Sequence, residues 1–348
     1  MEEPRHPKPD MAARYAAAGV DLQASAATME QIDDAVRSTY TPQVLAGLGA
    51  FGGLYALPGD VSEPVLVAST DGVGTKTMLA TALGRLDSIG RDIVNHCVND
   101  IIVQGARPLF FLDYVASSRL EPSEVAAVVK GVASACREAG MALLGGETAE
   151  MPGVYAAGGL DLVGTIVGVV SRSRIVTGER VKPGDALLGL PSGGLQTNGF
   201  SLARQVLGAR LHEPMYPGGR LGETIGDALM APHRSFLRAL EPLLAHGLLR
   251  AAAHVTGGGI PGNLPRVLPL GSGAEIDVRS WSRPPVFDLL QQAGEIDELE
   301  MRQVFNLGVG MVLVVAADDV AEVERLCPEQ GLWPIGRVVE GSGVRFVG

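Results

Sequence analysis

One short run of residues limits what this chain can build more than any other. It is Ser-Thr-Asp-Gly-Val-Gly-Thr-Lys at 69–76, directly after the apolar, β-branched segment Pro64–Ala68, which predicts a strand. An aspartate can hold a hard cation, glycines let backbone amides approach an anion, and a lysine can meet a phosphate charge. The spacing matches neither a Walker A loop nor a dinucleotide fingerprint. The run therefore predicts a nucleotide-phosphate site, or, more simply, a glycine turn with a surface lysine.

The composition excludes several functional classes. The chain has 348 residues, enough for two domains, and its formal charge of −11 argues against a nucleic-acid partner. Its three cysteines have no metal-ligand or redox spacing. The first ten residues lack the apolar segment of a signal peptide, and no apolar run approaches the ~20 residues of a membrane span. We expect a cytoplasmic protein without a membrane partner.

The order of strand and helix patterns predicts an α+β protein of two domains with mixed sheets, because strands and helices do not alternate strictly. We expect a disordered tail at 1–14, an N-terminal domain at 15–172 and a C-terminal domain at 173–348. Expected strands are 64–68, 109–115, 141–144, 160–170, 186–190 and 310–315, and expected helices are 26–39, 87–104, 122–139, 198–207, 225–246 and 318–326.

Three acids stand out as candidate metal ligands. Asp100 lies on the apolar stripe of helix 87–104, where a carboxylate is costly unless something compensates it. Glu147 follows Gly145 and Gly146 at the end of an expected strand. Together with Asp71, these acids could meet around one or two magnesium ions that bridge ATP phosphates. The alternatives are solvated turn acids and a helix-end acid paired with a local donor. In the same helix, His96 is expected to be a structural hydrogen-bonding partner.

Two further glycine turns lie in the second half of the chain. Ser-Gly-Gly-Leu-Gln-Thr-Asn-Gly at 192–199 leads into a helix, and Thr-Gly-Gly-Gly at 256–259 precedes another. Exposed amides at a helix start attract anions, so the turns could hold the phosphate of a substrate. Ordinary loop chemistry, with Asn198 as a helix N-cap, explains them equally well. His254, just before the second turn, is a weak candidate for acid or base catalysis.

Several longer strings resemble one enzyme family, aminoimidazole ribonucleotide synthetase, also called phosphoribosylformylglycinamidine cyclo-ligase. The resemblance runs in order from about Tyr15 to Val339. The strings that carry it are YAAAGVD at 15–21, STDGVGTK at 69–76, CVNDI at 97–101, GARPLFFLDY at 105–114, GGETAEMPG at 145–153, TNGFSL at 197–202, TGGG at 256–259 and FNLGVGM at 305–311.

The resemblance implies an ATP-dependent ring closure in de novo purine synthesis, in which formylglycinamidine ribonucleotide becomes aminoimidazole ribonucleotide. It also implies a requirement for magnesium, frequent involvement of potassium, and a homodimer whose N-terminal domains pair their sheets into a shared barrel. Expected catalytic residues are Asp71, Lys76 and Asp100, and expected metal ligands are Asp71, Asp100 and Glu147. Expected ATP-binding residues are Gly72, Gly74, Thr75, Lys76, Asn99, Gly145, Gly146 and Glu147. Expected substrate-binding residues are Ser192, Gly193, Asn198, Thr256, Gly257, Gly258 and Gly259.

The sequence departs from the family pattern at two places. Ser25 and Ala26 stand where the family commonly has Gly-Asn, and Gln196 stands where it usually has a histidine that could transfer a proton. Acid or base catalysis by residue 196 is therefore not expected, although Gln196 can still donate a hydrogen bond.

Two rival interpretations remain open. The first is another ATP-using enzyme of the same architecture, such as formylglycinamidine synthetase, a hydrogenase-maturation protein or thiamine-phosphate kinase. The second is a non-catalytic nucleotide-binding protein.

Overall fold

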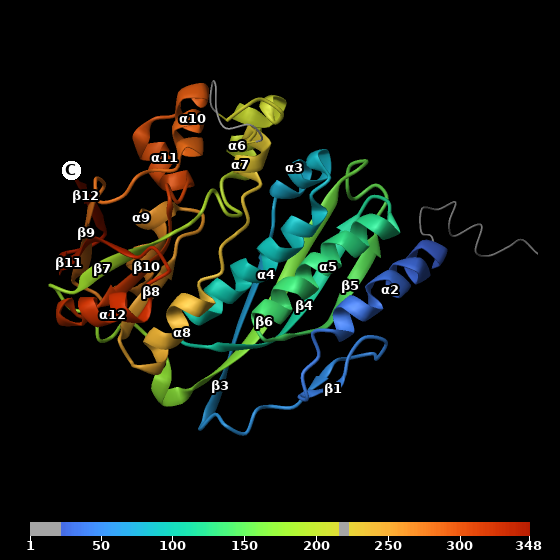
Figure 1. Ribbon diagram of the computed structural model, residues 1–348, viewed down its shortest axis with the longest axis horizontal. Helices are drawn as coiled ribbons and strands as arrows, with labels where there is room; N and C mark the ends of the chain where they lie inside the picture. Colours follow the sequence, from blue (N-terminus) through green and yellow to red (C-terminus); the bar gives the residue numbers. More distant parts are fainter. Residues whose placement is uncertain (1–21, 216–222) are drawn as a thin grey trace, which may run out of the picture.

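The described residues form two large β-sheets, each with its own set of helices, and one two-stranded ribbon (Figure 1). The computed structural model describes residues 22–215 and 223–348. The expected tail at 1–14 lies outside these residues. All strands of the first large sheet come from 64–171 and all strands of the second come from 186–347, so the expected boundary at 172/173 falls between them.

The first large sheet is mixed, as expected. Its order is β3-β6-β4-β5, with β6 antiparallel to both neighbours and β4 parallel to β5. A two-stranded ribbon precedes it in the chain. The strands are β1 (Val44–Ala46), β2 (Leu54–Tyr55), β3 (Pro64–Gly72), β4 (Arg107–Ser117), β5 (Ala142–Glu150) and β6 (Leu160–Ser171).

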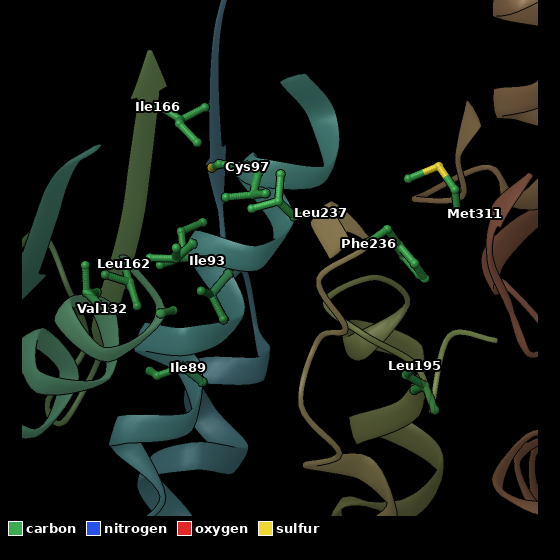
Figure 2. Packing of buried hydrophobic residues seen from close by; sticks show 14 of the residues in the cluster. Ile89, Ile93, Cys97, Val132, Leu162, Ile166, Leu195, Phe236, Leu237 and Met311 are labelled. Carbon is green, nitrogen blue, oxygen red and sulfur yellow. The ribbon is translucent and has the colours of Figure 1, made fainter. Parts of the chain in front are cut away.

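Helices α4 (Leu86–Ile102) and α5 (Pro122–Glu138) cover one face of this sheet, and α2 (Leu22–Arg37) packs on α5. Figure 2 shows Ile89, Ile93 and Cys97 of α4 beside Leu162 and Ile166 of β6. This confirms the apolar stripe expected from the sequence. All five side chains are fully buried, so α4 is fixed on the sheet along most of its length.

Two glycines set the distance between α4 and α5. A Cβ atom added at Gly131 would lie 2.0 Å from the Asp87 carbonyl oxygen, and one added at Gly90 would lie 2.1 Å from the Val128 carbonyl oxygen. The two backbones therefore touch, and neither position has room for a side chain.

The opposite face of the sheet is exposed at apolar positions. Side chains alternate along β3, so Val65 and Val67 pack toward the core while Leu66 is 56% exposed. On β4, Phe111 is buried and Leu112 is 36% exposed. An antiparallel or mixed sheet normally carries polar residues on its solvent face, so this face is unusually apolar for one in contact with water.

The second large sheet has the order β12-β9-β11-β7-β10-β8, in which β12 and β9 are parallel and the other pairs antiparallel. Its strands are β7 (Ala186–Pro191), β8 (Leu249–His254), β9 (Ser272–Asp277), β10 (Val309–Val315), β11 (Trp333–Glu340) and β12 (Val344–Val347). The remaining helices are α3 (Lys76–Leu83), α6 (Phe200–Leu207), α7 (Ile225–Leu229), α8 (Leu237–Ala245), α9 (Gly259–Asn263), α10 (Pro285–Gly294), α11 (Glu298–Val304) and α12 (Val320–Leu326).

Every expected strand overlaps an observed one, but three expectations about local structure were wrong. The single helix expected at 225–246 is two helices, α7 and α8, because Pro232 interrupts the pattern. Asp71 does not lie in a turn, since β3 continues through Gly72. Glu147 likewise lies within β5, where it pairs with Tyr114.

In the described part of the chain, no helix has both the length and the hydropathy to cross a bilayer.

Candidate active site

The candidate site is a cavity of about 590 Å³ between the two domains. The first domain contributes residues of β3 and α4 to its wall, and the second contributes residues of β8 and of both glycine turns. The lining residues that carry chemistry are Ser69, Asp71, His96, Asp100, Asn198, His254, Thr256, Asn263 and Arg266.

Asp71 and Asp100 meet in this cavity, as the sequence predicted. Ser69 links them, because its Oγ lies 3.4 Å from Asp71 Oδ2 and 3.2 Å from Asp100 Oδ2. Burial, together with the neighbouring Asp100 carboxylate, raises the pKa of Asp71 to about 7. Burial alone would also raise the pKa of Asp100, but the hydrogen bond and charge of His254 outweigh it and lower that pKa. The pair thus presents closely spaced oxygens that a cation would stabilise.

Two histidines face the acids. His254 Nδ1 lies 2.8 Å from Asp100 Oδ1, and His96 Nε2 lies 3.5 Å from Asp71 Oδ1 and 3.6 Å from Asp100 Oδ2. Burial lowers the pKa of His96 to about 4, so its ring is neutral near pH 7. His254 was only a weak candidate for acid or base catalysis from the sequence. In the structure it directly contacts Asp100, a candidate metal ligand.

A third histidine stands behind the first two. His233 Nε2 lies 3.2 Å from His254 Nε2, and its Nδ1 lies 3.2 Å from the Thr197 hydroxyl, which also contacts His96 Nδ1 at 2.7 Å. Asn99 fixes the segment that carries His233, because its Oδ1 accepts from Phe236 N and its Nδ2 donates to the Arg234 carbonyl oxygen. In this arrangement Asn99 supports the site from behind and does not line the cavity.

The structure places Lys76 away from the cavity, which differs from the phosphate-binding role expected for it. Its side chain is fully buried, and Nζ lies 2.6 Å from Asp92 Oδ2. Nζ also donates to the carbonyl oxygens of Gln196 at 2.9 Å and Ala231 at 3.1 Å. Lys76 Nζ thus makes one ion pair and two hydrogen bonds, all to groups inside the protein. Lys76 is thus a buried link between the two domains.

Glu147, Gly145 and Gly146 do not join the other acids within one chain. Gly146 is exposed and is three strands away from Asp71 along the ladder, roughly 14 Å at ordinary strand spacing. Gly146 lies against Asp113, whose Oδ1 would be 2.1 Å from an added Cβ atom. The expected cluster of three acids is therefore a pair in the single chain.

The two glycine turns of the second domain lie next to each other. A Cβ atom at Gly257 would be 3.4 Å from Asn198 Oδ1. Asn198 Nδ2 is buried and has no hydrogen-bond partner among the described residues. Asn263 braces the Thr256–Gly259 turn by donating to the carbonyl oxygens of Gly257 and Gly259. These contacts leave an unused donor, Asn198 Nδ2, at the cavity.

Other residues of the first domain's glycine run and of the 192–199 turn have local roles. Gly72 is an ordinary strand residue, Gly74 has a positive φ of 64°, and Thr75 contacts the Ser201 hydroxyl at 3.2 Å. Ser192 is fully buried and bonds within its own turn, whereas Gly193 is exposed. None of these five residues is in the lining of the cavity as described.

Sequence reasoning missed several contributors to the site. Arg266 is the one arginine or lysine among the described lining residues, and its position gave no signal in the sequence. His233 also carried no signal in the sequence. The proline before it was the available clue, since Pro232 breaks the helix that would otherwise have carried His233 elsewhere.

Comparisons with known proteins identify the family. One family model, described as AIR synthase related protein, N-terminal domain, matches residues 55–170, and another, described as AIR synthase related protein, C-terminal domain, matches 182–348. A phosphoribosylformylglycinamidine cyclo-ligase from Sorangium cellulosum is 51% identical over 342 residues, covering 97% of this chain and 98% of that protein. The chain belongs to the cyclo-ligase family. A second cyclo-ligase, from Bacillus cereus, is 47% identical over 344 residues, covering 97% and 99%. The resemblance found in the sequence is confirmed.

Solved structures with the same fold extend beyond the cyclo-ligase family. Thiamine-monophosphate kinase from Stenotrophomonas maltophilia has a TM-score of 0.66 at 20% identity, covering 91% of this chain and 96% of that one. Hydrogenase maturation protein HypE in complex with ATP has a TM-score of 0.65 at 20% identity, covering 90% and 86%. At this identity, the likeness concerns the fold alone.

Proposed function

We propose that the protein converts formylglycinamidine ribonucleotide to aminoimidazole ribonucleotide, using ATP and releasing ADP and phosphate. The observation that supports this most directly is the acid pair Asp71–Asp100 in an interdomain cavity, in a chain of the cyclo-ligase family. The HypE structure with ATP supports an ATP-using site on this fold. We place the enzyme in the cytoplasm, in purine biosynthesis.

The chemistry has two parts, and both suit a rigid polar cavity. A formamide oxygen is a poor leaving group, so phosphoryl transfer from ATP to that oxygen activates the carbon. The amidine nitrogen then attacks this carbon, closes a five-membered ring and expels phosphate. Phosphoryl transfer depends mainly on charge neutralisation and alignment, and the ring closure depends on holding the nitrogen near the carbon.

The acid pair fits magnesium. Two carboxylates and the Ser69 hydroxyl converge, and hard cations prefer such oxygen ligands. Asp71 and Asp100 would hold the ion, which would neutralise phosphate charge during transfer. Because Glu147 lies across the sheet, any contribution from Glu147 would have to come from a second copy of the chain. A potassium ion would need oxygen ligands other than those that Asp71, Asp100 and Ser69 offer to magnesium.

The substrate phosphate is proposed to bind on the second domain's side of the cavity. Asn198 presents an unused amide donor there, and Arg266 supplies a positive charge. The Thr256–Gly259 turn adds backbone amides. The reacting formamide would then point toward the acid pair, between the two domains.

We also propose a homodimer in which two first sheets pair into a shared barrel. The support is the exposed apolar face that includes Leu66 and Leu112. A second copy with the same face would bury those leucines and remove them from water.

Replacement of either acid tests the function. Asp71→Asn and Asp100→Asn should each lower kcat at least about 100-fold, because each removes a charged ligand of the ion that would neutralise the developing charge of the phosphoryl group. Turnover is measured as formylglycinamidine ribonucleotide-dependent release of ADP, without glutamine or ammonia. Asp60→Asn, at a surface acid outside the cavity, is the matched control and should retain full activity. Wild-type turnover in Asp71→Asn or Asp100→Asn would reject the assignment.

A further inference from the structure

The cavity contains a second kind of ligand set beside the acid pair. His96, Asp100 and His254 each offer one ligand atom, and these three atoms all lie within 4.8 Å of one another. Magnesium takes oxygen ligands, whereas imidazole nitrogens suit zinc and other transition metals. We propose that each chain binds one Zn²⁺ ion through His96 Nε2, His254 Nδ1 and the Asp100 carboxylate.

The distances between the ligand atoms suit a tetrahedral ion. With metal–ligand distances of about 2.0–2.1 Å, ligand atoms in a tetrahedral site lie about 3.3 Å apart. His254 Nδ1 lies 2.8 Å from Asp100 Oδ1, and His96 Nε2 lies 3.6 Å from the other oxygen of that carboxylate, Oδ2. Each histidine nitrogen is thus close to the tetrahedral separation from one oxygen of Asp100.

The groups behind the histidines match those found behind metal ligands. A ligating imidazole usually donates its other N–H to an acceptor, which fixes the ring. His96 Nδ1 is 2.7 Å from Thr197 Oγ1, and His254 Nε2 is 3.2 Å from His233 Nε2. If His233 carries its proton on Nδ1, it donates to the same Thr197 oxygen at 3.2 Å. One tautomer of each ring therefore satisfies every second nitrogen while His96 Nε2 and His254 Nδ1 stay free for the ion.

Zinc would occupy Asp100, which the proposed function assigns to magnesium. Because Asp100 belongs to both ligand sets, the two ions exclude each other, and zinc would inhibit the nucleotide reaction. Zinc binding itself rests on the geometry alone and does not depend on the proposed cyclisation. A binding measurement without nucleotide therefore separates the two proposals.

Cobalt is a suitable probe, because tetrahedral Co²⁺ absorbs visible light strongly and octahedral Co²⁺ does so weakly. The full chain, free of tag, nucleotide and magnesium, should bind one Co²⁺ with strong visible bands, and one equivalent of Zn²⁺ should abolish them. His96→Gln and His254→Gln should lose the bands. His246→Gln, at an exposed histidine, is the control and should keep them. Thr197→Val should weaken zinc binding by about 10–100-fold.

Circular dichroism and thermal unfolding verify that each variant is folded. Weak octahedral bands in the wild type, or strong bands retained in both His96→Gln and His254→Gln, would overturn the proposal. Anomalous diffraction at the zinc edge needs no variant. With one equivalent of zinc, a peak among His96, Asp100 and His254 supports the site, whereas a peak elsewhere or no peak rejects it.

Discussion

At the scale of single residues, Lys76 and Asp92 form a fully buried ion pair. Both side chains are fully buried, and their charged atoms are 2.6 Å apart. A buried charge without a partner is costly, so each residue depends on the other. Lys76 belongs to the first domain but donates to two carbonyl oxygens of the second. Lys76, at the end of the glycine-containing run 69–76, thus links the two domains.

We predict that Asp92→Asn and Lys76→Met each lower the free energy of unfolding by about 3–5 kcal/mol, because each leaves an uncompensated buried charge. The measurement is urea denaturation followed by circular dichroism. The double variant should recover part of the loss, since no lone charge remains. A Lys76→Met variant with unchanged stability but weakened ATP binding would contradict this and restore the phosphate-binding role.

Residue-level predictions from the sequence succeeded where local pattern decides the position of a side chain. Asp100 was placed correctly because it shares a helical stripe with Ile93 and Cys97. Lys76 was misplaced because the sequence does not say which acid, if any, is its partner: Asp92 lies 16 residues further on. Glu147 was misplaced because strand order, which no local pattern encodes, puts β5 at the far edge of the sheet.

At the scale of elements, the close contact between α4 and α5 depends on two glycines, which have no side chains. Gly90 and Gly131 let the two backbones meet. Because α4 carries His96 and Asp100, the position of α4 against α5 also determines where these two side chains lie.

We predict that Gly131→Ala lowers the free energy of unfolding by roughly 1–3 kcal/mol, because its methyl group would press on the Asp87 carbonyl oxygen. This loss should outweigh the better helix propensity of alanine, which is worth about 1 kcal/mol. Chemical denaturation measures the change. Lys130→Ala, exposed on the same helix, should stay within about 0.5 kcal/mol of wild type. Equal stability of Gly131→Ala and Lys130→Ala would refute the close contact.

Elements with strong periodicity were predicted well, and those that depend on tertiary context were not. The helix at 122–139 was recognised from Pro122 and Gly140, and α5 ends within a residue of that range. The strand β8 was missed, since its Leu-Arg-Ala-Ala-Ala-His sequence has helical propensity, yet pairing with β10 makes it extended. The end of β3 was missed because pairing with β6 carries the strand past Asp71.

At the scale of the whole molecule, the exposed apolar face of the first sheet is the feature that most needs a partner. Leu66 is 56% exposed and Leu112 is 36% exposed on that face. A sheet with this surface gains free energy when a second copy covers it, at roughly 25 cal/mol per Å² of apolar area buried.

We predict that Leu66→Asp converts a two-chain assembly into single chains, because a charge on each copy would be buried in the interface. Sedimentation equilibrium measures the mass. Leu270→Asp, at an equally apolar and fully exposed position of the second domain, should leave the mass unchanged. A wild-type protein that sediments as one chain would show that the exposed face is not a dimer interface.

Helix α4 has a further consequence for motion. It is seated on the first sheet, yet Asp92, Asn95 and Asn99 all bind the backbone at 233–236 of the second domain, and Lys76 reaches Ala231 beside it. Rotating the two domains apart would break all of these buried hydrogen bonds at once. These bonds therefore oppose hinge bending between the domains, and we expect substrates to reach the cavity without separation of its two walls.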